Sequence, residues 1–137
     1  MTAASSRSGP WYAAFDGGPG TPLHARESAA AFLTAIADQA PPADATRFDK
    51  ALLVVSELVT NAVRHAPGPV VLTLDAEDGG IGITVRDTSP VLPEPRSPDL
   101  LGGTGGFGWS AIIEPLAIDF DVRSHPGGKE IHALLPW

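Results

Sequence analysis

One helical pattern, from Leu53 to Ala66, constrains the fold of this chain more than any other stretch of the sequence. When successive residues are placed about 100° apart around a helix axis, the apolar residues in and just before this stretch fall on one broad arc. The arc contains Ala51, Leu52, Val55, Leu58, Val59, Ala62, Val63 and Ala66. A stripe of that width has to be buried, so the pattern predicts a helix packed against a core.

The polar residues of the same helix fall on the opposite side, which holds Glu57, Thr60, Asn61 and Arg64. Glu57 and Asn61 are four residues apart, so the carboxylate and the amide lie one helical turn from each other and can converge on a single ligand. For such a pair taken alone, a solvated helix face is the simpler interpretation. The rest of the chain has to decide between a ligand site and a solvated face.

Length and composition predict one globular domain. A chain of 137 residues can bury a core without disulfides, and its hydrophobic fraction of 43% is that of a globular protein. No apolar run approaches the roughly 18 residues of a membrane span. We therefore expect a soluble domain over residues 11–137, preceded by a small, polar, disordered leader over residues 1–10. Cysteine is absent, which leaves the cytoplasm as the default location.

The formal net charge of −7 argues against a nucleic-acid surface. Binding to a phosphate backbone needs a basic stripe, and nine Lys and Arg residues spread along the chain do not make one. Any phosphate that this protein binds must therefore be held locally, by a few groups.

The periodicity along the chain predicts a two-layer α+β sandwich. We expect a strand at Trp11–Phe15, followed by a helix at Leu23–Gln39. The second helix is the one described above; Asp44 or Thr46 can cap its start, and it ends before Pro67. Strands at Val70–Glu77 and Ile81–Asp87, a short helix at Trp109–Glu114 that Pro115 ends or kinks, and a closing hairpin of Ala117–Arg123 with Glu130–Leu135 complete the predicted order. Hairpins on either side of one helix require a mostly antiparallel, mixed sheet, covered on one face by the helices.

Asp87 is the polar end of an apolar row. Ile81, Ile83, Val85 and Asp87 alternate along the predicted strand, so all four side chains point to the face that the helices cover. A carboxylate in that position needs a hydrogen-bond donor as its partner.

A glycine-rich stretch is the second strong signal, and it follows a loop with four prolines between Thr88 and Leu101. It consists of Gly102, Gly103, Thr104, Gly105, Gly106, Phe107 and Gly108. It leads into a predicted helix N-terminus, where free N–H groups favour an anion such as phosphate. It neither follows the first strand of a βαβ unit nor contains a Walker-type lysine, so dinucleotide-binding and Walker motifs are excluded. A flexible linker is the alternative, although Phe107 and Trp109 are unusual in one.

Together, Glu57-x-x-x-Asn61 on a helix, Asp87 at a strand end and a glycine loop before a short helix resemble the GHKL (Bergerat-fold) ATP-binding superfamily. Within it, the segment from Ser56 to His65 is most similar to anti-sigma-factor serine/threonine kinases and the related small regulatory ATP-binding proteins of actinobacteria. The resemblance extends from about Leu23 to the C-terminus.

The resemblance implies roles for individual residues. Asn61 would ligate a Mg²⁺ ion that bridges the ATP phosphates, and Glu57 would orient or deprotonate the attacking nucleophile. Asp87 would accept a hydrogen bond from the adenine amino group, and Gly102 to Gly108 would wrap the phosphates. Arg64, on the face that carries Glu57, either contacts phosphate or is a solvated charge. Mg²⁺ binds few protein oxygens together with phosphate and water, which suits a single amide oxygen.

Two departures from the family pattern keep a second hypothesis open. Asp87 is followed by Thr-Ser-Pro where the family has glycines, and Gly128-Lys129 is followed by Glu130 where relatives often have threonine. Intact Glu57 and Asn61 favour a serine/threonine kinase that acts on a small regulatory protein. That partner would be an antagonist of the anti-sigma type, a sigma factor or both. The departures favour a nucleotide-sensing adaptor that transfers no phosphate. Because relatives often dimerise, the resemblance also makes a homodimer an expectation.

Overall fold

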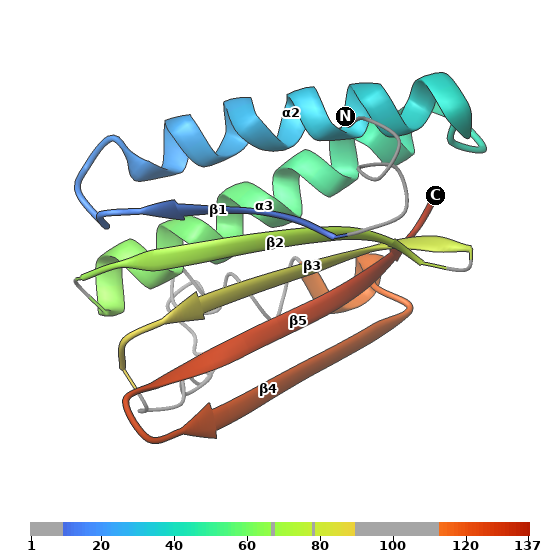
Figure 1. The fold of residues 1–137 in the computed structure, drawn as a ribbon. Coiled ribbons are helices and arrows are strands. Elements are labelled where there is room, and N and C mark those ends of the chain that lie inside the picture. Colours follow the sequence, from blue (N-terminus) through green and yellow to red (C-terminus); the bar gives the residue numbers. More distant parts are fainter. Residues whose placement is uncertain (1–9, 67, 78, 90–112) are drawn as a thin grey trace, which may run out of the picture.

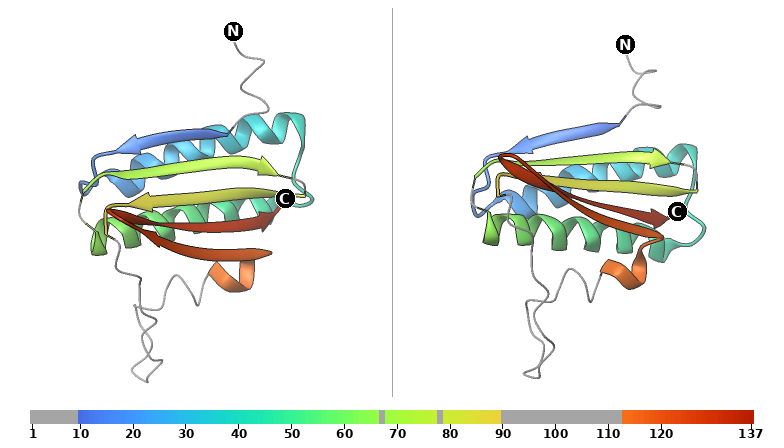
Figure 2. Two further views of the ribbon diagram at one scale, coloured as in Figure 1. Left: turned by 60° about the horizontal axis from the view of Figure 1, so that its bottom comes forward. Right: turned by 90° about the horizontal axis from the view of Figure 1, so that it is seen from below.

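The computed structural model describes residues 10–66, 68–77, 79–89 and 113–137. The elements follow in the order β1 (Trp11–Phe15), α2 (Thr21–Gln39), α3 (Ala45–His65), β2 (Val70–Glu77), β3 (Gly80–Asp87), the 3-10 helix η3 (Glu114–Leu116), β4 (Asp119–His125) and β5 (Gly128–Pro136). Five strands form one sheet in the order β1-β2-β3-β5-β4, and each neighbouring pair is antiparallel. Helices α2 and α3 lie side by side on one face of this sheet, here called the inner face (Figures 1 and 2). The predicted two-layer α+β sandwich is therefore confirmed, although the five strands are antiparallel throughout, where a mixed sheet was predicted.

Helix α3 begins where its sequence predicts. Asp44 is the N-cap, and its carboxylate accepts a hydrogen bond from the Thr46 backbone N–H at 2.9 Å and another from the Thr46 hydroxyl. These bonds satisfy a backbone donor that the first helical turn leaves free. The Thr46 hydroxyl is the main cause that holds the pKa of Asp44 below its usual range, although desolvation acts in the opposite direction. At the other end, the helix stops at His65, just before Pro67 and Gly68.

The core lies between the two helices and the inner face of the sheet. Seven residues of α3 are buried: Ala51, Leu52, Val54, Val55, Leu58, Val59 and Ala62. They pack with alternate residues of β2, β3 and β5, such as Leu72, Ile83 and Ala133. Within the described ranges, no helix has the length and apolar character that a membrane crossing needs.

Aromatic side chains pack the helices against the sheet. The rings of Trp11 on β1 and Phe32 on α2 stack with their centroids 5.8 Å apart. Trp137 lies near Phe48 of α3, with ring centroids 6.2 Å apart, and its indole N–H donates to the carbonyl of Ala40 at 2.7 Å. The Ala43 N–H also donates to the Trp137 carbonyl, so α3 begins at the C-terminal end of β5. It then runs back toward the start of β5 (Figure 1).

The structure differs from the sequence-based expectation at several boundaries. Helix α2 begins at Thr21 rather than Leu23, because Pro22 fits the first helical turn, where no N–H donor is needed. Pro115 lies in the first turn of η3, where its missing N–H is tolerated for the same reason. The closing hairpin turns at Pro126 and Gly127, where Gly127 has a φ of 86°. The predicted helix residues 109–112, the proline-rich stretch from Pro90 and the glycine loop lie outside the described residues.

We predict that Asp44→Ala lowers the stability of the protein at neutral pH, because it removes the acceptor that caps α3. Because the folded-state pKa of Asp44 is lowered, its charge stabilises the fold fully above the ordinary pKa of 3.8, and this contribution is lost as the pH falls through the lowered value. Asp44→Asn keeps a capping oxygen, so it should stay close to wild type at neutral pH and lose this pH dependence. Urea unfolding midpoints between pH 7 and pH 2.5 measure both effects, and equal midpoints for Asp44→Ala and wild type at pH 7 would contradict the prediction.

Candidate functional site

The polar arc of α3 is half-buried. Glu57, Thr60 and Asn61 are each partly covered, whereas Arg64 is exposed. The Nδ2 atom of Asn61 is buried, and it has no hydrogen-bond partner among the described residues. A buried amide donor without a partner costs free energy, so this group is unexplained by folding alone. A plain solvated helix face therefore does not describe these residues.

Asp87 closes the inner row of β3. Ile81, Ile83 and Val85 are at most 1% exposed and Asp87 is 4% exposed, so the predicted row is confirmed, including its buried polar end. Asp87 is the last residue of β3, and it continues the row of Ile81, Ile83 and Val85, which belong to the core between the sheet and the helices. The sequence also predicted that this carboxylate needs a donor, and the structure supplies one.

The partner of Asp87 is Lys129, on the neighbouring strand β5. The two residues are directly opposite each other in the antiparallel register, and Lys129 Nζ lies 2.8 Å from Oδ2 and 3.1 Å from Oδ1. Only 6% of the Lys129 side chain and 2% of the Asp87 side chain are exposed. Sequence reasoning missed Lys129, although a signal for it exists. Lys129, Ile131, Ala133 and Leu135 alternate as the inner row of β5, as Asp87 does with its own row.

The structure places Glu130 away from Asp87, on the other face of the sheet. In the sequence, Glu130 stands where relatives often have threonine. It is opposite Arg86 in the register and forms an ion pair with it at 3.4 Å, on the outer face of the sheet. Because side chains alternate along a strand, Glu130 cannot share the face of Lys129 and Asp87. The residue that modifies the surroundings of Asp87 is Lys129.

The candidate site gathers at one end of the inner face. Helix α3 starts at the end of β5 and runs antiparallel to that strand's direction, so its last turns lie over the start of β5 and the end of β3 (Figures 1 and 2). The last turns of α3, which carry Asn61, thus lie at the end of the sheet that holds the Asp87–Lys129 pair, and Glu57 lies one helical turn earlier, near the middle of the helix. The glycine loop from Gly102 to Gly108 lies outside the described residues, so its predicted contact with phosphate stays a prediction.

Gly128 allows the strands to come close beside Asp87. A Cβ atom at this position would lie 2.1 Å from the Asp87 carbonyl oxygen, far inside van der Waals contact. Only glycine therefore permits this approach of β5 to β3. The approach sets the position of the next residue, Lys129, opposite the Asp87 side chain.

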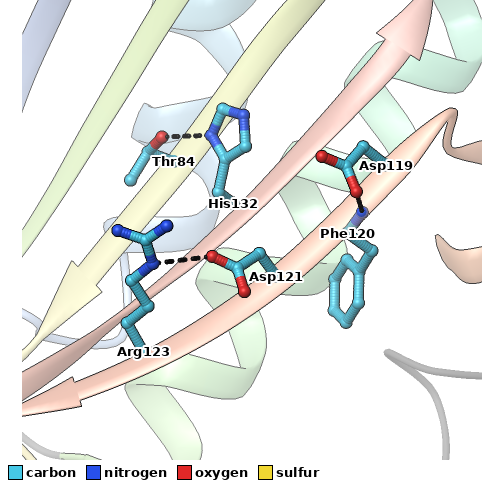
Figure 3. Close-up of polar contacts among 6 residues, drawn as sticks. All are labelled: Thr84, Asp119, Phe120, Asp121, Arg123 and His132. Atoms are coloured by element: carbon cyan, nitrogen blue, oxygen red, sulfur yellow. Dashed lines mark hydrogen bonds and ion pairs between the residues drawn. The ribbon is translucent and has the colours of Figure 1, made fainter.

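A separate hollow of about 400 Å³ lies on the outer face of the sheet. It is lined by Thr84, Asp119, Phe120, Asp121, Arg123, Glu130 and His132. Its polar groups bond to each other: the Thr84 hydroxyl and His132 Nδ1 are 2.8 Å apart, and Arg123 Nε donates to Asp121 at 2.8 Å (Figure 3). Pairing of this kind leaves few groups for a ligand, so we place the functional site on the inner face.

The chain is similar to known proteins over most of its length. The family model described as "Histidine kinase-like ATPase domain" matches residues 18–134. Two curated Mycobacterium tuberculosis proteins are each 29% identical to the chain over 86% of its length, "Sensor histidine kinase component HK1" and "Probable sensor histidine kinase HK". The chain covers 82% of the first protein and 36% of the second.

A solved structure supports the same fold. The crystal structure of the RsbU and RsbW domains of a Mycobacterium tuberculosis protein superposes with a TM-score of 0.68. The match covers 94% of this chain and 32% of the other, with 18% sequence identity. At that identity the likeness concerns the fold alone, and it agrees with the sheet and helix arrangement described above.

We predict that Gly128→Ala destabilises the protein by about 1–3 kcal/mol, because the added methyl group forces β5 away from the Asp87 carbonyl. Gly20→Ala is a suitable control, since its Cβ would meet only ordinary contacts, with His24 Cε1 at 3.5 Å. Chemical denaturation of both variants measures the effect. A Gly128→Ala protein as stable as wild type would show that the strands are not held together as closely as described.

Proposed function

The chain belongs to the histidine kinase-like ATPase domain family, and from this premise we propose that it binds ATP with Mg²⁺ and acts as a regulatory serine/threonine kinase on a small partner protein. The proposal is supported by the position of the last turns of α3, which carry Asn61, at the end of the inner face where β3 ends with Asp87. Glu57 and Asn61 come from α3, and Asp87 comes from the end of β3. The GHKL resemblance of the sequence is confirmed by the family match.

Asn61 is the proposed metal ligand. Its Nδ2 is buried without a hydrogen-bond partner among the described residues, so the amide is available to a group that comes with the nucleotide. A phosphate oxygen would accept a hydrogen bond from Nδ2, whereas a rotation of the amide by 180° would present Oδ1 to a cation at the same point. Mg²⁺ would supply neutralisation of the phosphate charge in this position.

Glu57 is the proposed catalytic residue. In the transfer, the substrate hydroxyl oxygen forms a bond to the γ-phosphorus, the bond from that phosphorus to the bridging oxygen breaks, and ADP leaves. The hydroxyl proton goes to the Glu57 carboxylate, one helical turn from Asn61. Its half-buried position on α3 would keep the carboxylate close to the phosphates while leaving it reachable by a second protein.

The remaining contacts to ATP follow the family pattern. We propose that Asp87 accepts a hydrogen bond from the adenine amino group, and that Gly102 to Gly108 wrap the phosphates with backbone N–H groups. Arg64, exposed on the last turn of α3, is proposed to contact a phosphate at the open side of the site. The helix C-terminus is an ordinary place for a basic residue, so a solvated Arg64 is the alternative.

The RsbW domain of the structural neighbour guides the choice of partner. We propose a small regulatory protein of the anti-sigma antagonist type, a sigma factor or both, with a homodimer as the proposed assembly. The lack of cysteine fits the cytoplasm, which we propose as the location. A nucleic-acid or membrane partner is not part of this proposal, because the chain carries a net charge of −7.

A nucleotide-sensing adaptor without phosphoryl transfer is the second candidate function. It is favoured by the segment after Asp87, where Thr88, Ser89 and Pro90 replace the glycines of the family pattern. Without glycine, the backbone approaches a ligand less closely. Such an adaptor would bind ATP and the partner and leave both chemically unchanged.

We predict that the protein binds ATP in the presence of Mg²⁺ and that Asn61→Ala weakens this binding by at least about tenfold, because a metal ligand is lost. Isothermal titration calorimetry measures the affinity, with EDTA removing the metal contribution in a parallel titration. Lys50→Gln is the control, since Lys50 is an exposed residue of the same helix. The absence of any heat with wild-type protein would remove ATP binding from the proposal.

We predict that Glu57→Gln lowers the rate of phosphate transfer to the partner by about 10²- to 10⁴-fold, because the proton acceptor is lost, while the affinity for ATP is kept. Transfer of radiolabelled γ-phosphate measures the rate, with the exposed Glu27→Gln as control. A serine or threonine product is stable in acid, whereas the phosphohistidine expected of a histidine kinase is not. Normal transfer by Glu57→Gln would remove Glu57 as the base, and ATP binding without transfer by wild type would favour the adaptor.

A further inference from the structure

The hydrogen bonds around Asp87 use most of its capacity as an acceptor. A carboxylate has about four lone-pair positions, two on each oxygen. Oδ1 accepts the Ser89 backbone N–H at 2.9 Å and the Lys129 ammonium at 3.1 Å, so both of its positions are used. The same ammonium lies 2.8 Å from Oδ2 as an ion pair, so it covers one side of that oxygen and leaves one acceptor position on its other side.

The ammonium group of Lys129 is equally occupied. It has three N–H donors, and it contacts Asp87 Oδ1, Asp87 Oδ2 and, at 3.4 Å, the Ser89 carbonyl oxygen. Among the described residues, these three oxygens surround the ammonium, so we expect it not to contact a ligand directly. Any influence of Lys129 on a bound base therefore acts through Asp87, by fixing which carboxylate positions are open.

We propose that Lys129 is a positioning residue that makes the site select adenine over guanine, by leaving Asp87 a single acceptor position on Oδ2. This inference rests on the proposed binding of ATP. The adenine amino group can give one N–H to that position. The edge of guanine offers two parallel donors, N1–H and an N2–H, which together match the two oxygens of a carboxylate. The ammonium that bridges both oxygens occupies the positions that guanine would need.

Because both side chains are buried, water does not readily replace either partner of the Asp87–Lys129 ion pair. Only 2% of the Asp87 side chain and 6% of the Lys129 side chain are exposed. Separating the pair would leave two buried charges without compensation, so the ammonium stays on the carboxylate when a base arrives. The register of β3 and β5, with Asp87 opposite Lys129, holds both main chains in place. The open position on Oδ2 thus has a fixed direction.

The first test compares nucleotide selectivity between variants. The dissociation constants of ATP, GTP and ITP are measured with Mg²⁺ for wild type, Lys129→Met and Lys129→Arg. We expect Lys129→Met to reduce the preference for ATP over GTP by about tenfold or more, because both oxygens of Asp87 become available. ITP has N1–H but lacks the N2 amino group, so its affinity should rise less. Lys129→Arg should keep the wild-type ratio, because a guanidinium fork also bridges both oxygens.

Arg123→Gln is the matched control, since it removes the same charge from an exposed ion pair with Asp121 on β4. The ratio of the GTP and ATP dissociation constants of this variant should equal that of wild type. A folded Lys129→Met protein with the wild-type ratio would overturn the role of Lys129 while leaving ATP binding intact. Failure of wild type to bind any of the three nucleotides would instead overturn the proposed function, and with it this inference.

A second measurement needs no variant and decides the question if Lys129→Met does not fold. In wild-type protein labelled with ¹⁵N-lysine, a buried and fully bonded ammonium exchanges slowly and gives its own NMR signal. We expect the Lys129 signal to be present without nucleotide and to persist when ATP is added. Its loss on ATP binding would show that the ammonium leaves Asp87 for the base, which would overturn the proposal.

Discussion

The packing of α3 on the inner face of the sheet is the contact on which both the core and the candidate site depend. Seven buried residues of this helix join it to the apolar rows of the strands. Because one arc of the helix is used for this contact, Glu57 and Asn61 can only lie on the remaining arc. The direction of α3, set by the contacts of Ala43 and Phe48 with Trp137, then decides the end of the sheet at which these groups lie.

Stability alone does not account for the buried Asp87–Lys129 pair. Removing one partner of a buried pair costs about 3–5 kcal/mol, yet replacing both by apolar residues is often neutral or stabilising. A chain selected for stability alone could therefore extend the apolar rows of β3 and β5 by one residue each. The presence of a carboxylate and an ammonium at these two positions points to a functional requirement, in agreement with the ligand roles proposed for this end of the sheet.

Much of the fold could be predicted from the sequence, because helices and strands follow local periodicity. The bounds of β2, the cap at Asp44 and the apolar row that ends at Asp87 all follow from patterns within about twenty residues. One boundary was wrong where a proline fits a first helical turn, at Pro22. The face of Glu130 was left open by the sequence, since a shift of one residue along a strand moves every side chain to the other face.

The sequence by itself determined that Glu57 and Asn61 share a helix face and that Asp87 is a buried carboxylate in need of a donor. Both conclusions depend only on the geometry of a single helix or strand. The identity of that donor was decided by the tertiary structure. Lys129 is 42 residues away in the chain, and it meets Asp87 because Gly128 lets β5 approach β3 in one particular register. Such a register is a property of the assembled sheet, since it is fixed by the packing of both strands against the helices.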